Sequence, residues 1–560
     1  MKKYLLIGII IIATVLRLWH LNINPPSLTP DEAALGYNAY SILKTGRDEY
    51  GTFMPIIFKS FGDYKPGFYI YTTVPFVAVF GLNEWSVRLP SAVAGILAVF
   101  LLYKIMQLLF EKNETFSSLP IISTFLLAIS PWHIYFSRGA WEINLSLTLT
   151  LLGIFFFLKS LKDSKFLFFS ALSFALTLIT YQGAKLSTAI VILLLGIMFW
   201  KESFSLITKH IKTVSLSIVL LLLISTPIIF SFFGGQTGRL AVFSVFSYRR
   251  PTQSLTAFLN QSSEKVGDVS YYLFHSEALN FGRGIMGRWF NHFSGKFLFF
   301  EGDWENPKQT TPYHGVLTIA DIFLFISGLY FLAKNLTLKN KGILFVFLWL
   351  ILAPLPAVLS RDQVHAVRSF NMVIPLTILL ALGLFHFIEL FNSFKKGIKA
   401  TCYVLLVTCY SLSYIYFLDL YFVHLPVHNA QVWDYGYKQI VQDVAPIQNN
   451  YAKIRVQQSY AQPYIFFLFY EKYDPATYQK KAAYVEGEYK NDVGKIEHLD
   501  NLCFCPIDWS VNRGDTDTLF VADELHMPTS DSNDPNLFNV LDTIKYPNGF
   551  TAFRVVEVKK

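Results

Sequence analysis

The chain has 560 residues, of which 53% are hydrophobic, 17% aromatic and only 15% charged. Soluble domains have about 25% charged residues, so this composition excludes an ordinary soluble protein. The repeated long apolar stretches instead predict an integral membrane protein. The net charge of +8 comes from lysines in the loops between these stretches and does not indicate nucleic-acid binding.

The first apolar segment, 4–19, follows Lys2 and Lys3 and is long enough to cross a bilayer. We expect it to remain as a span, because the bulky residues 16–20 offer no small-residue cleavage site. The acidic pair Asp31-Glu32 comes about ten residues later, after Pro30. It begins a predicted helix over 31–44. The two acids, at the mouth of the first span, are candidates for catalysis. The alternative is that they only cap this helix.

Apolar segments recur along the chain and predict about eleven transmembrane helices. The segment 68–80 is apolar but short, and we expect it to be an interfacial or half-buried helix. With 68–80 kept at the outer surface, the lysines fall on one side of the membrane, which satisfies the positive-inside rule. The predicted spans are 4–20, 86–110, 119–136, 143–158, 166–180, 186–200, 213–232, 315–333, 343–359, 371–390 and 400–418.

Most loop arginines fall on the opposite, outer side, against the topological trend. A bidentate anion partner is one physical reason to keep them there. The arginines concerned are Arg138, Arg239, Arg249, Arg250, Arg283, Arg288, Arg361 and Arg368. The N-terminus is therefore expected inside, with loops 21–85 and 233–314 outside.

Residues in these outer loops are candidates for binding a lipid phosphate. Lys65 stands just before the apolar segment 68–80, where it either contacts a phosphate or only snorkels to the membrane surface. Arg138 and Glu142 flank a tight turn between two spans, where a structural ion pair is the alternative. His314 follows in the long loop, although a lone histidine is more often structural.

The last part of the chain, 419–560, changes character, and we predict a small extracytoplasmic α/β domain there. Strands are expected at 519–522 and 550–558, the second after an Asn548-Gly549 turn, and a helix at 463–470. Cys503 and Cys505 are only two residues apart, and this spacing argues against a mutual disulfide. Cys402 and Cys409 lie in an apolar segment. The sequence contains no strong metal site.

The motifs taken together resemble the membrane-embedded C-type (GT-C) glycosyltransferases. The most similar subset is the polyprenyl-phosphate-sugar transferases related to the protein O-mannosyltransferases and the aminoarabinose transferase of lipid A. The resemblance covers the membrane part, expected over 1–418, and Gly67 departs from the proline of many relatives. The residues that carry it are Thr29-Pro30-Asp31-Glu32-Ala33, Asp63-Tyr64-Lys65-Pro66-Gly67-Phe68-Tyr69, Val87-Arg88-Leu89-Pro90-Ser91-Ala92 and Ser137-Arg138.

The resemblance implies a mostly α polytopic enzyme that moves a sugar, with inversion, from a polyprenyl phosphate to a hydroxyl. The acceptor would be a lipid, a glycan or a protein. No certain cofactor is expected, and a divalent cation is left open. The implied catalytic base is Asp31, with Glu32 and Glu142 as further acids. We expect phosphate contacts from Lys65, Arg138, Arg239 and Arg368, and substrate contacts from Tyr64, Tyr69 and His314.

Two alternatives stay open. The run Trp433-Asp434-Tyr435-Gly436 resembles the acceptor-recognition motif of oligosaccharyltransferases, but Val432 stands where a second tryptophan is usual. A packed aromatic turn also explains the run. A multi-pass transporter or flippase is the second alternative, although transporters tend to place charges at the bilayer midplane. Here the charges collect at the outer ends of the predicted spans.

Overall fold

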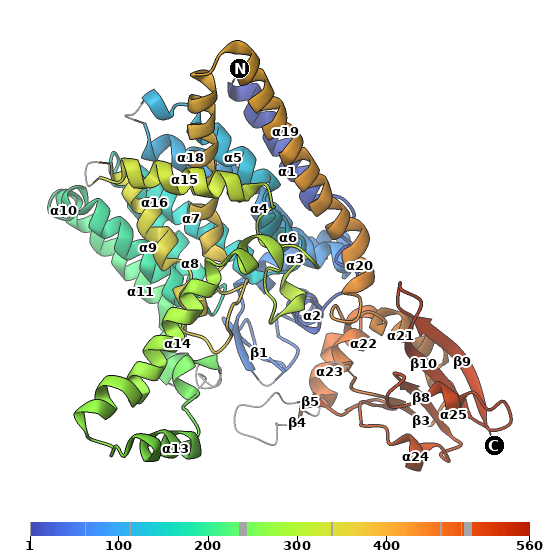
Figure 1. The fold of residues 1–560 in the computed structure, drawn as a ribbon. Helices are drawn as coiled ribbons and strands as arrows, with labels where there is room; N and C mark the ends of the chain where they lie inside the picture. Colours follow the sequence, from blue (N-terminus) through green and yellow to red (C-terminus); the bar gives the residue numbers. More distant parts are fainter. Residues whose placement is uncertain are drawn as a thin grey trace.

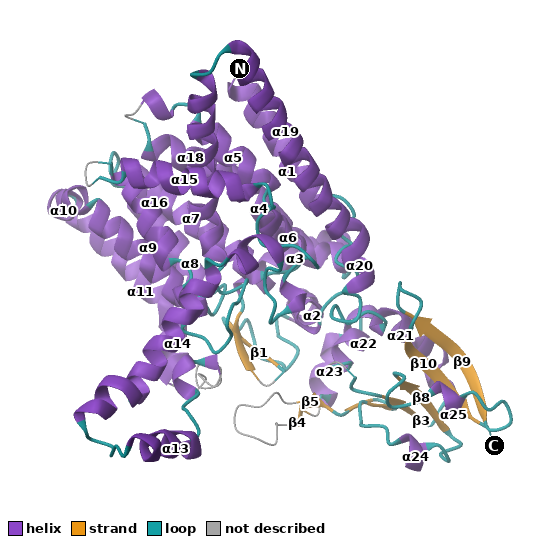
Figure 2. Cartoon of the chain, in the orientation of Figure 1, coloured by secondary structure: helices purple, strands orange, loops and turns teal. Residues whose placement is uncertain are grey.

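The fold comes from a computed structural model that describes residues 2–61, 63–111, 114–233, 243–337, 340–459, 462–482, 484–485 and 495–559. A helical bundle forms one part, and a region rich in strands forms the other (Figures 1 and 2). The helices up to residue 428 are α1 (Lys2–Leu18), α2 (Pro30–Thr45), α3 (Phe68–Phe80), α4 (Glu84–Leu109), α5 (Leu119–Ile129), α6 (Pro131–Arg138), α7 (Glu142–Ser160), α8 (Phe166–Leu178), α9 (Ala184–Met198), α10 (Trp200–Lys209), α11 (Ile211–Phe233), α13 (Thr252–Ser262), α14 (Glu277–His292), α15 (Asp321–Asn335), α16 (Lys341–Leu352), α17 (Leu355–Val358), α18 (Val373–Asn392), α19 (Lys396–Asp419) and α20 (Leu425–His428).

Six helices in the described ranges are long and apolar enough to cross a membrane, or up to eight if each bent pair is one span. The bent pairs are α5 with α6 and α9 with α10, with angles of 54° and 87°. Eight of the eleven predicted spans fall on these candidates. The other three, 4–20, 166–180 and 315–333, form the shorter helices α1, α8 and α15, so the count of eleven is not confirmed.

The short apolar segment 68–80 forms helix α3. Its 13 residues reach only about 20 Å, less than the roughly 30 Å of a bilayer core. Helix α3 contacts α2 and α4, and this keeps it beside the acidic pair. The predicted helix over 31–44 is also confirmed, as α2.

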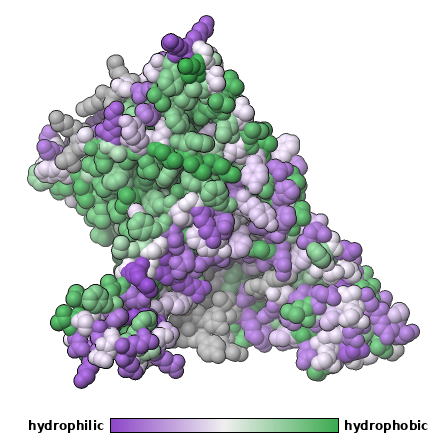
Figure 3. All heavy atoms as spheres, viewed as in Figure 1, coloured by the Kyte–Doolittle hydropathy of each residue, from purple (hydrophilic) through white to green (hydrophobic). Residues whose placement is uncertain are grey.

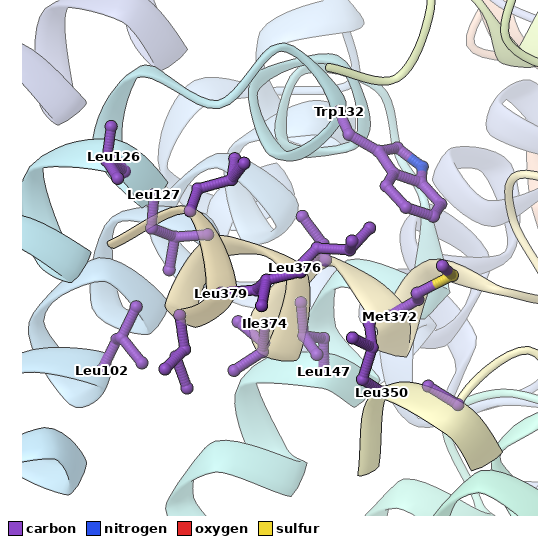
Figure 4. Packing of buried hydrophobic residues seen from close by; sticks show 14 of the residues in the cluster. Leu102, Leu126, Leu127, Trp132, Leu147, Leu350, Met372, Ile374, Leu376 and Leu379 are labelled. Atoms are coloured by element: carbon purple, nitrogen blue, oxygen red, sulfur yellow. The ribbon is translucent and has the colours of Figure 1, made fainter. Parts of the chain in front are cut away.

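The bundle core surrounds α18, which buries twelve residues and packs against α5, α15 and α16, and the same hydrophobic cluster includes residues of α4 and α7. Figure 4 shows leucines from several of these helices around Ile374, Leu376 and Leu379. The pair α15 and α18 approaches closely at two glycines. A Cβ on Gly383 would lie 2.0 Å from the Leu324 carbonyl oxygen, and one on Gly328 would lie 2.3 Å from that of Leu379. Small residues allow such close packing of helices.

The surface of the bundle bears a broad apolar band, whereas polar residues gather over the other end of the molecule (Figure 3). The start of α1 and the strand-rich region lie at opposite ends (Figure 1). Helix α19 follows the outside of the bundle, and most of its side chains are exposed. This pattern fits a bundle whose sides face lipid.

The strand-rich region contains a six-stranded mixed sheet in the order β6-β7-β3-β8-β10-β9. The strands predicted at 519–522 and 550–558 are confirmed as β8 and β10, and the helix at 463–470 as α22. Gly549, with φ of +89°, closes the turn between β9 and β10. The elements are α21 (Tyr437–Val444), β3 (Lys453–Val456), α22 (Tyr464–Tyr470), α23 (Pro475–Lys481), β4 (Tyr484–Val485), β5 (Lys495–Ile496), β6 (His498–Leu499), β7 (Leu502–Cys503), α24 (Trp509–Asn512), β8 (Thr518–Ala522), α25 (Thr529–Ser532), β9 (Phe538–Lys545) and β10 (Thr551–Val558), and the hairpin β1 (Ile57–Ser60) and β2 (Asp63–Pro66) lies apart from this sheet.

The prediction against a disulfide between Cys503 and Cys505 is wrong, because the structure joins these two residues. Their Cα atoms are 5.3 Å apart, within the range that a disulfide spans. Strand β7 ends at Cys503, and Cys505 follows in an irregular segment.

Candidate active site

The acidic pair lies in the first turn of α2, where the two side chains are held differently. Thr29 is the N-cap: its hydroxyl accepts a hydrogen bond from the Glu32 amide, and its own amide donates to the Glu32 carboxylate. This is a capping box, with Pro30 at the first helical position. Successive helical residues point about 100° apart. Asp31 therefore faces away from the direction of Glu32.

Glu32 is buried and held on both carboxylate oxygens. Arg88 donates to it from Nε at 3.1 Å and from Nη2 at 3.3 Å, and the Ala140 amide donates at 2.8 Å. Arg88 also donates to three backbone carbonyls of the segment between α1 and α2. This ion pair fixes α2 to α4 and to the turn before α7. Its contacts are those of a positioning group.

Asp31 is the exposed member of the pair, with 65% of its side chain accessible. It contacts the Lys65 ammonium, whose side chain is only 12% exposed. The Lys65 Nζ atom also lies 5.6 Å from the centre of the Phe61 ring. The structure thus brings together the predicted base and the predicted phosphate contact, from residues 34 positions apart. An accessible carboxylate beside a nearly buried cation suits proton transfer next to an anion.

The hairpin β1–β2 and the start of α3 position Lys65. The Tyr64 carbonyl accepts a hydrogen bond from Gln182 Nε2 at 2.7 Å, and the Phe68 amide donates to the Ile179 carbonyl at 3.0 Å. A Cβ on Gly67 would lie 2.2 Å from the Phe58 ring. Glycine at this position therefore lets β1 pack directly on the chain after Lys65, which gives the departure from proline a structural reason.

The other predicted acid and substrate contacts are spread around this pair. Glu142 begins α7 and is half-buried. The Tyr64 side chain is half-buried, whereas Tyr69 is fully buried and its hydroxyl donates to the Val87 carbonyl at 2.9 Å. His314 is buried, and its Nδ1 atom bonds the Gly315 carbonyl at 2.6 Å. Burial lowers the pKa of His314 to about 4, so the ring is neutral near pH 7.

The predicted arginine contacts have different surroundings. Arg138 is buried and donates to the carbonyls of Leu16, Trp19 and Asn24 at 2.6–3.0 Å, so its guanidinium closes the end of α1. Arg368 pairs with Asp362 at 2.7 Å and lies over the ring of Phe243. Arg239 lies outside the described residues. The phosphate contacts of these three arginines remain predictions.

A second ion pair, absent from the sequence predictions, lies near the acidic pair. Lys308 Nζ contacts Asp434 Oδ2 at 2.8 Å. Burial raises the pKa of Asp434, Lys308 opposes this effect, and the carboxylates of Asp31 and Glu32 raise the pKa further. Asp434 therefore lies within electrostatic range of the Asp31-Glu32 pair. Trp433 itself is fully buried against Tyr135 and Trp141, which makes this run a packed aromatic turn.

Helix α2 is also held by the strand-rich region. The Tyr37 hydroxyl donates to the Tyr473 carbonyl at 3.1 Å, and Gln479 Nε2 donates to the Ser41 hydroxyl at 3.0 Å. Gly36 allows α22 to approach, because a Cβ there would lie 2.6 Å from the Phe469 ring. One hydrophobic cluster contains residues from α2, α3, α21, α22 and the mixed sheet. Helix α2, which carries Asp31, therefore shares one hydrophobic core with the strand-rich region.

Glu49 is another acid that the sequence did not single out. It is fully buried, exchanges hydrogen bonds with Asn38 at 3.0 Å, and accepts from the Tyr464 hydroxyl at 3.4 Å. Burial raises the pKa of Glu49 to about 8. Among the described residues, no group of three or more His, Cys, Asp or Glu side chains is placed to hold a metal ion.

A sequence model of the family described as "Dolichyl-phosphate-mannose-protein mannosyltransferase" matches residues 65–230. No protein of curated function matches the chain. Among solved structures, ArnT from Cupriavidus metallidurans bound to undecaprenyl phosphate is similar, with a TM-score of 0.52, 12% identity, and coverage of 98% of this chain and 97% of that one. This likeness shows a shared fold.

Two further structures are similar at lower scores. The apo oligosaccharyltransferase from Archaeoglobus fulgidus matches with a TM-score of 0.47 and 12% identity, over 84% of this chain and 63% of that one. The arabinofuranosyltransferase AftD from Mycobacteria matches with a TM-score of 0.40 and 10% identity, over 100% and 40%. The family match and the shared fold confirm the resemblance to the C-type membrane glycosyltransferases.

Proposed function

We propose that this chain is an inverting glycosyltransferase that moves a sugar from a polyprenyl-phosphate carrier to an acceptor hydroxyl at the extracytoplasmic membrane face. The observation that carries the proposal is the contact between exposed Asp31 and nearly buried Lys65. Helix α2, which carries Asp31, and the hairpin that carries Lys65 lie at the end of the bundle that bears the strand-rich region (Figure 1). The ArnT structure contains undecaprenyl phosphate, a carrier of this chemical class.

In the proposed reaction, Asp31 accepts the proton of the acceptor hydroxyl. The oxygen attacks the anomeric carbon from the side opposite the phosphate, the bond from that carbon to the phosphate oxygen breaks, and the lipid phosphate leaves. The configuration at the carbon inverts. Lys65 stabilises the negative charge that develops on the leaving phosphate. A donor phosphate competes with the Asp31 carboxylate for the same ammonium, and so releases the carboxylate to act as a base.

The proposal assigns the base to Asp31 because both oxygens of Glu32 are already held by Arg88 and the Ala140 amide. Glu142 remains the alternative base. Arg239 and Arg368 are proposed as further phosphate contacts, whereas the three carbonyls around Arg138 favour a structural role for that residue. The acceptor is proposed to be a lipid, a glycan or a protein.

The direct test uses purified protein and a panel of polyprenyl-phosphate sugars, with released polyprenyl phosphate and new glycosidic product measured together. We expect one donor class to support transfer. Lys65→Ala should lower donor turnover by about 10-fold or more, because a charged hydrogen bond is lost, and Lys65→Arg should restore part of it. Lys65 only snorkels if Lys65→Ala has wild-type kinetics, and no turnover with any donor would contradict the proposed function.

The proposed face is tested separately by labelling single cysteines in intact cells, after Cys402 and Cys409 are changed to serine. A cysteine at Ser510, an exposed position in the strand-rich region, should react with a reagent that cannot cross the membrane. A cysteine at Lys334, at the end of α15, should be protected. The reverse pattern would place the site on the cytoplasmic face.

A further inference from the structure

A cavity of about 380 Å³ lies between α14 and the short helix η2 (Val245–Ser247), apart from the Asp31–Lys65 pair. None of its lining residues belongs to α2, α3 or the β1–β2 hairpin. Its volume is within the range of small-molecule sites in proteins. The polar lining comes mainly from Tyr248, Asn280, Arg283, Arg288 and Gln363.

Two guanidinium groups give this cavity its chemistry. Arg288 is fixed, because its Nε and Nη2 atoms donate to the Arg361 carbonyl at 3.3 and 3.1 Å. Arg283 is exposed, and within the described ranges it has no hydrogen bond or ion pair. Glu305 and Asp362 lie close enough to Arg288 to offset part of its charge. The charge of Arg283, which also lines the cavity, is not offset by an ion pair with any described residue.

The cavity extends over two glycines in the middle of α14. Gly284 and Gly287 both line it. A Cβ on Gly287 would meet no atom within 4 Å, whereas a Cβ on Gly284 would lie 2.8 Å from Arg288 Nη1. Glycine inside a helix is unfavourable relative to alanine, and packing does not require it at Gly287. Glycine at these positions keeps open space beside the two arginines.

We propose that this cavity binds the phosphate or carboxylate group of a molecule presented at this end of the bundle. Arginine binds such planar or tetrahedral anions through paired N–H donors. Arg288 is held in place for that contact by the Arg361 carbonyl, and Arg283 supplies the charge that no described carboxylate neutralises. The volume leaves room for a glycerol or sugar unit beside the anion. The inference is independent of the chemistry assigned to Asp31.

The test uses the full-length protein in neutral phosphatidylcholine nanodiscs with two anionic probes. Radiolabelled glycerol 3-phosphate reports a soluble anion, and phosphatidylglycerol, counted by native mass spectrometry, reports a lipid headgroup. We expect saturable binding of at least one probe. Arg283→Gln and Arg288→Gln should each weaken it by about 10-fold or more, because a charged hydrogen bond is lost. Which probe binds identifies the source of the anion.

A matched pair of variants on the same helix tests the space without changing charge. Gly287→Leu fills the cavity and should weaken binding. Gly282 is an equally open position that does not line the cavity, so Gly282→Leu should bind the probe as the wild type does. Asp31→Asn should also bind as wild type, so a failure of the proposed transfer reaction leaves this result standing. The proposal is overturned if neither probe binds saturably, or if all variants bind alike.

Discussion

The segments around α2 and around α14 lie at the same end of the bundle (Figure 1) but are packed very differently. Helix α2 buries ten residues between α3, α4 and the strand-rich region, whereas α13 and α14 each bury one. The two segments therefore suit different proposed roles. The proposed base Asp31, which would need a fixed position relative to the reacting atoms, is on the packed helix α2. Arg283 and Arg288, which line the open cavity, are on α14. We call the segment from α13 to α14 (residues 252–292) the arm; it is lightly packed, so its local stability is expected to be lower.

The largest effect on activity is expected on the packed helix α2, at Asp31. Asp31→Asn keeps the size of the side chain but removes the base. If Asp31 is the base, transfer should fall by about 10²–10⁴-fold, while donor binding persists. The melting temperature should change little, because position 31 is 65% exposed and the asparagine side-chain oxygen can still accept a hydrogen bond from the Lys65 ammonium. Transfer assays on Glu142→Gln serve as the comparison, and a loss confined to that variant would move the base to α7.

Arg88 should show the opposite result, with a large effect on folding. Arg88→Met leaves the buried Glu32 carboxylate without its positively charged partner and leaves three backbone carbonyls without their donor. Breaking a buried ion pair on one side costs about 3–5 kcal/mol. We expect a clear fall in the thermal midpoint of purified protein, with activity lost in proportion to unfolding. An Arg88→Met protein with an unchanged thermal midpoint would contradict this structural role.

Glu49 tests whether the packed element responds to pH. Its pKa is raised from 4.5 to about 8, so in this window the folded state binds the proton that the unfolded state has released. Its contribution to stability is therefore largest below pH 4.5 and is lost as the pH rises to 8, with a slope of up to about 1.4 kcal/mol per pH unit. Glu49→Gln should flatten this slope in thermal melts from pH 5 to 8. An unchanged slope would contradict the attribution of this pH dependence to Glu49.

The smallest effect is expected on the arm. Val269, between α13 and α14, is 75% exposed, and Val269→Ser should change the free energy of unfolding by less than about 0.5 kcal/mol. Chemical denaturation of the purified protein measures this. A larger loss would show that the arm is packed against something in the folded protein, and would remove the contrast with α2.

Local patterns predicted much of the fold. The start of α2 at Pro30, the turn before β10 and eight of the apolar spans are features of contiguous sequence, so residue order alone indicates them, although the N-cap of α2 is Thr29 and not the acidic pair. The three spans that are not confirmed are apolar in sequence, but their helices have 17, 13 and 15 residues. Hydropathy does not report where a helix ends inside an apolar run.

The candidate site was predicted only in part, for a related reason. Asp31 is a candidate because it follows the first apolar span, and Lys65 is one because it stands just before the apolar segment 68–80. Arg88 was visible as a charge in an apolar helix but was not assigned a partner. Lys308 and Asp434 are 126 positions apart, and nothing local links them. Contacts at such separations depend on how the bundle and the strand-rich region pack, and one sequence carries no direct signal for that.

The packing of α2 on α22 and α23 also has a consequence for synthesis. Tyr37 and Tyr473 are separated by 436 positions, so a ribosome needs roughly 20–90 s to make the second after the first. During that time, the partners of α2 in the strand-rich region do not yet exist. The contacts of α2 with α22 and α23 thus form only after residues 473–479 are made, and a product terminated before them inserts a bundle whose α2 keeps the Arg88 and Ala140 contacts but lacks those of the strand-rich region.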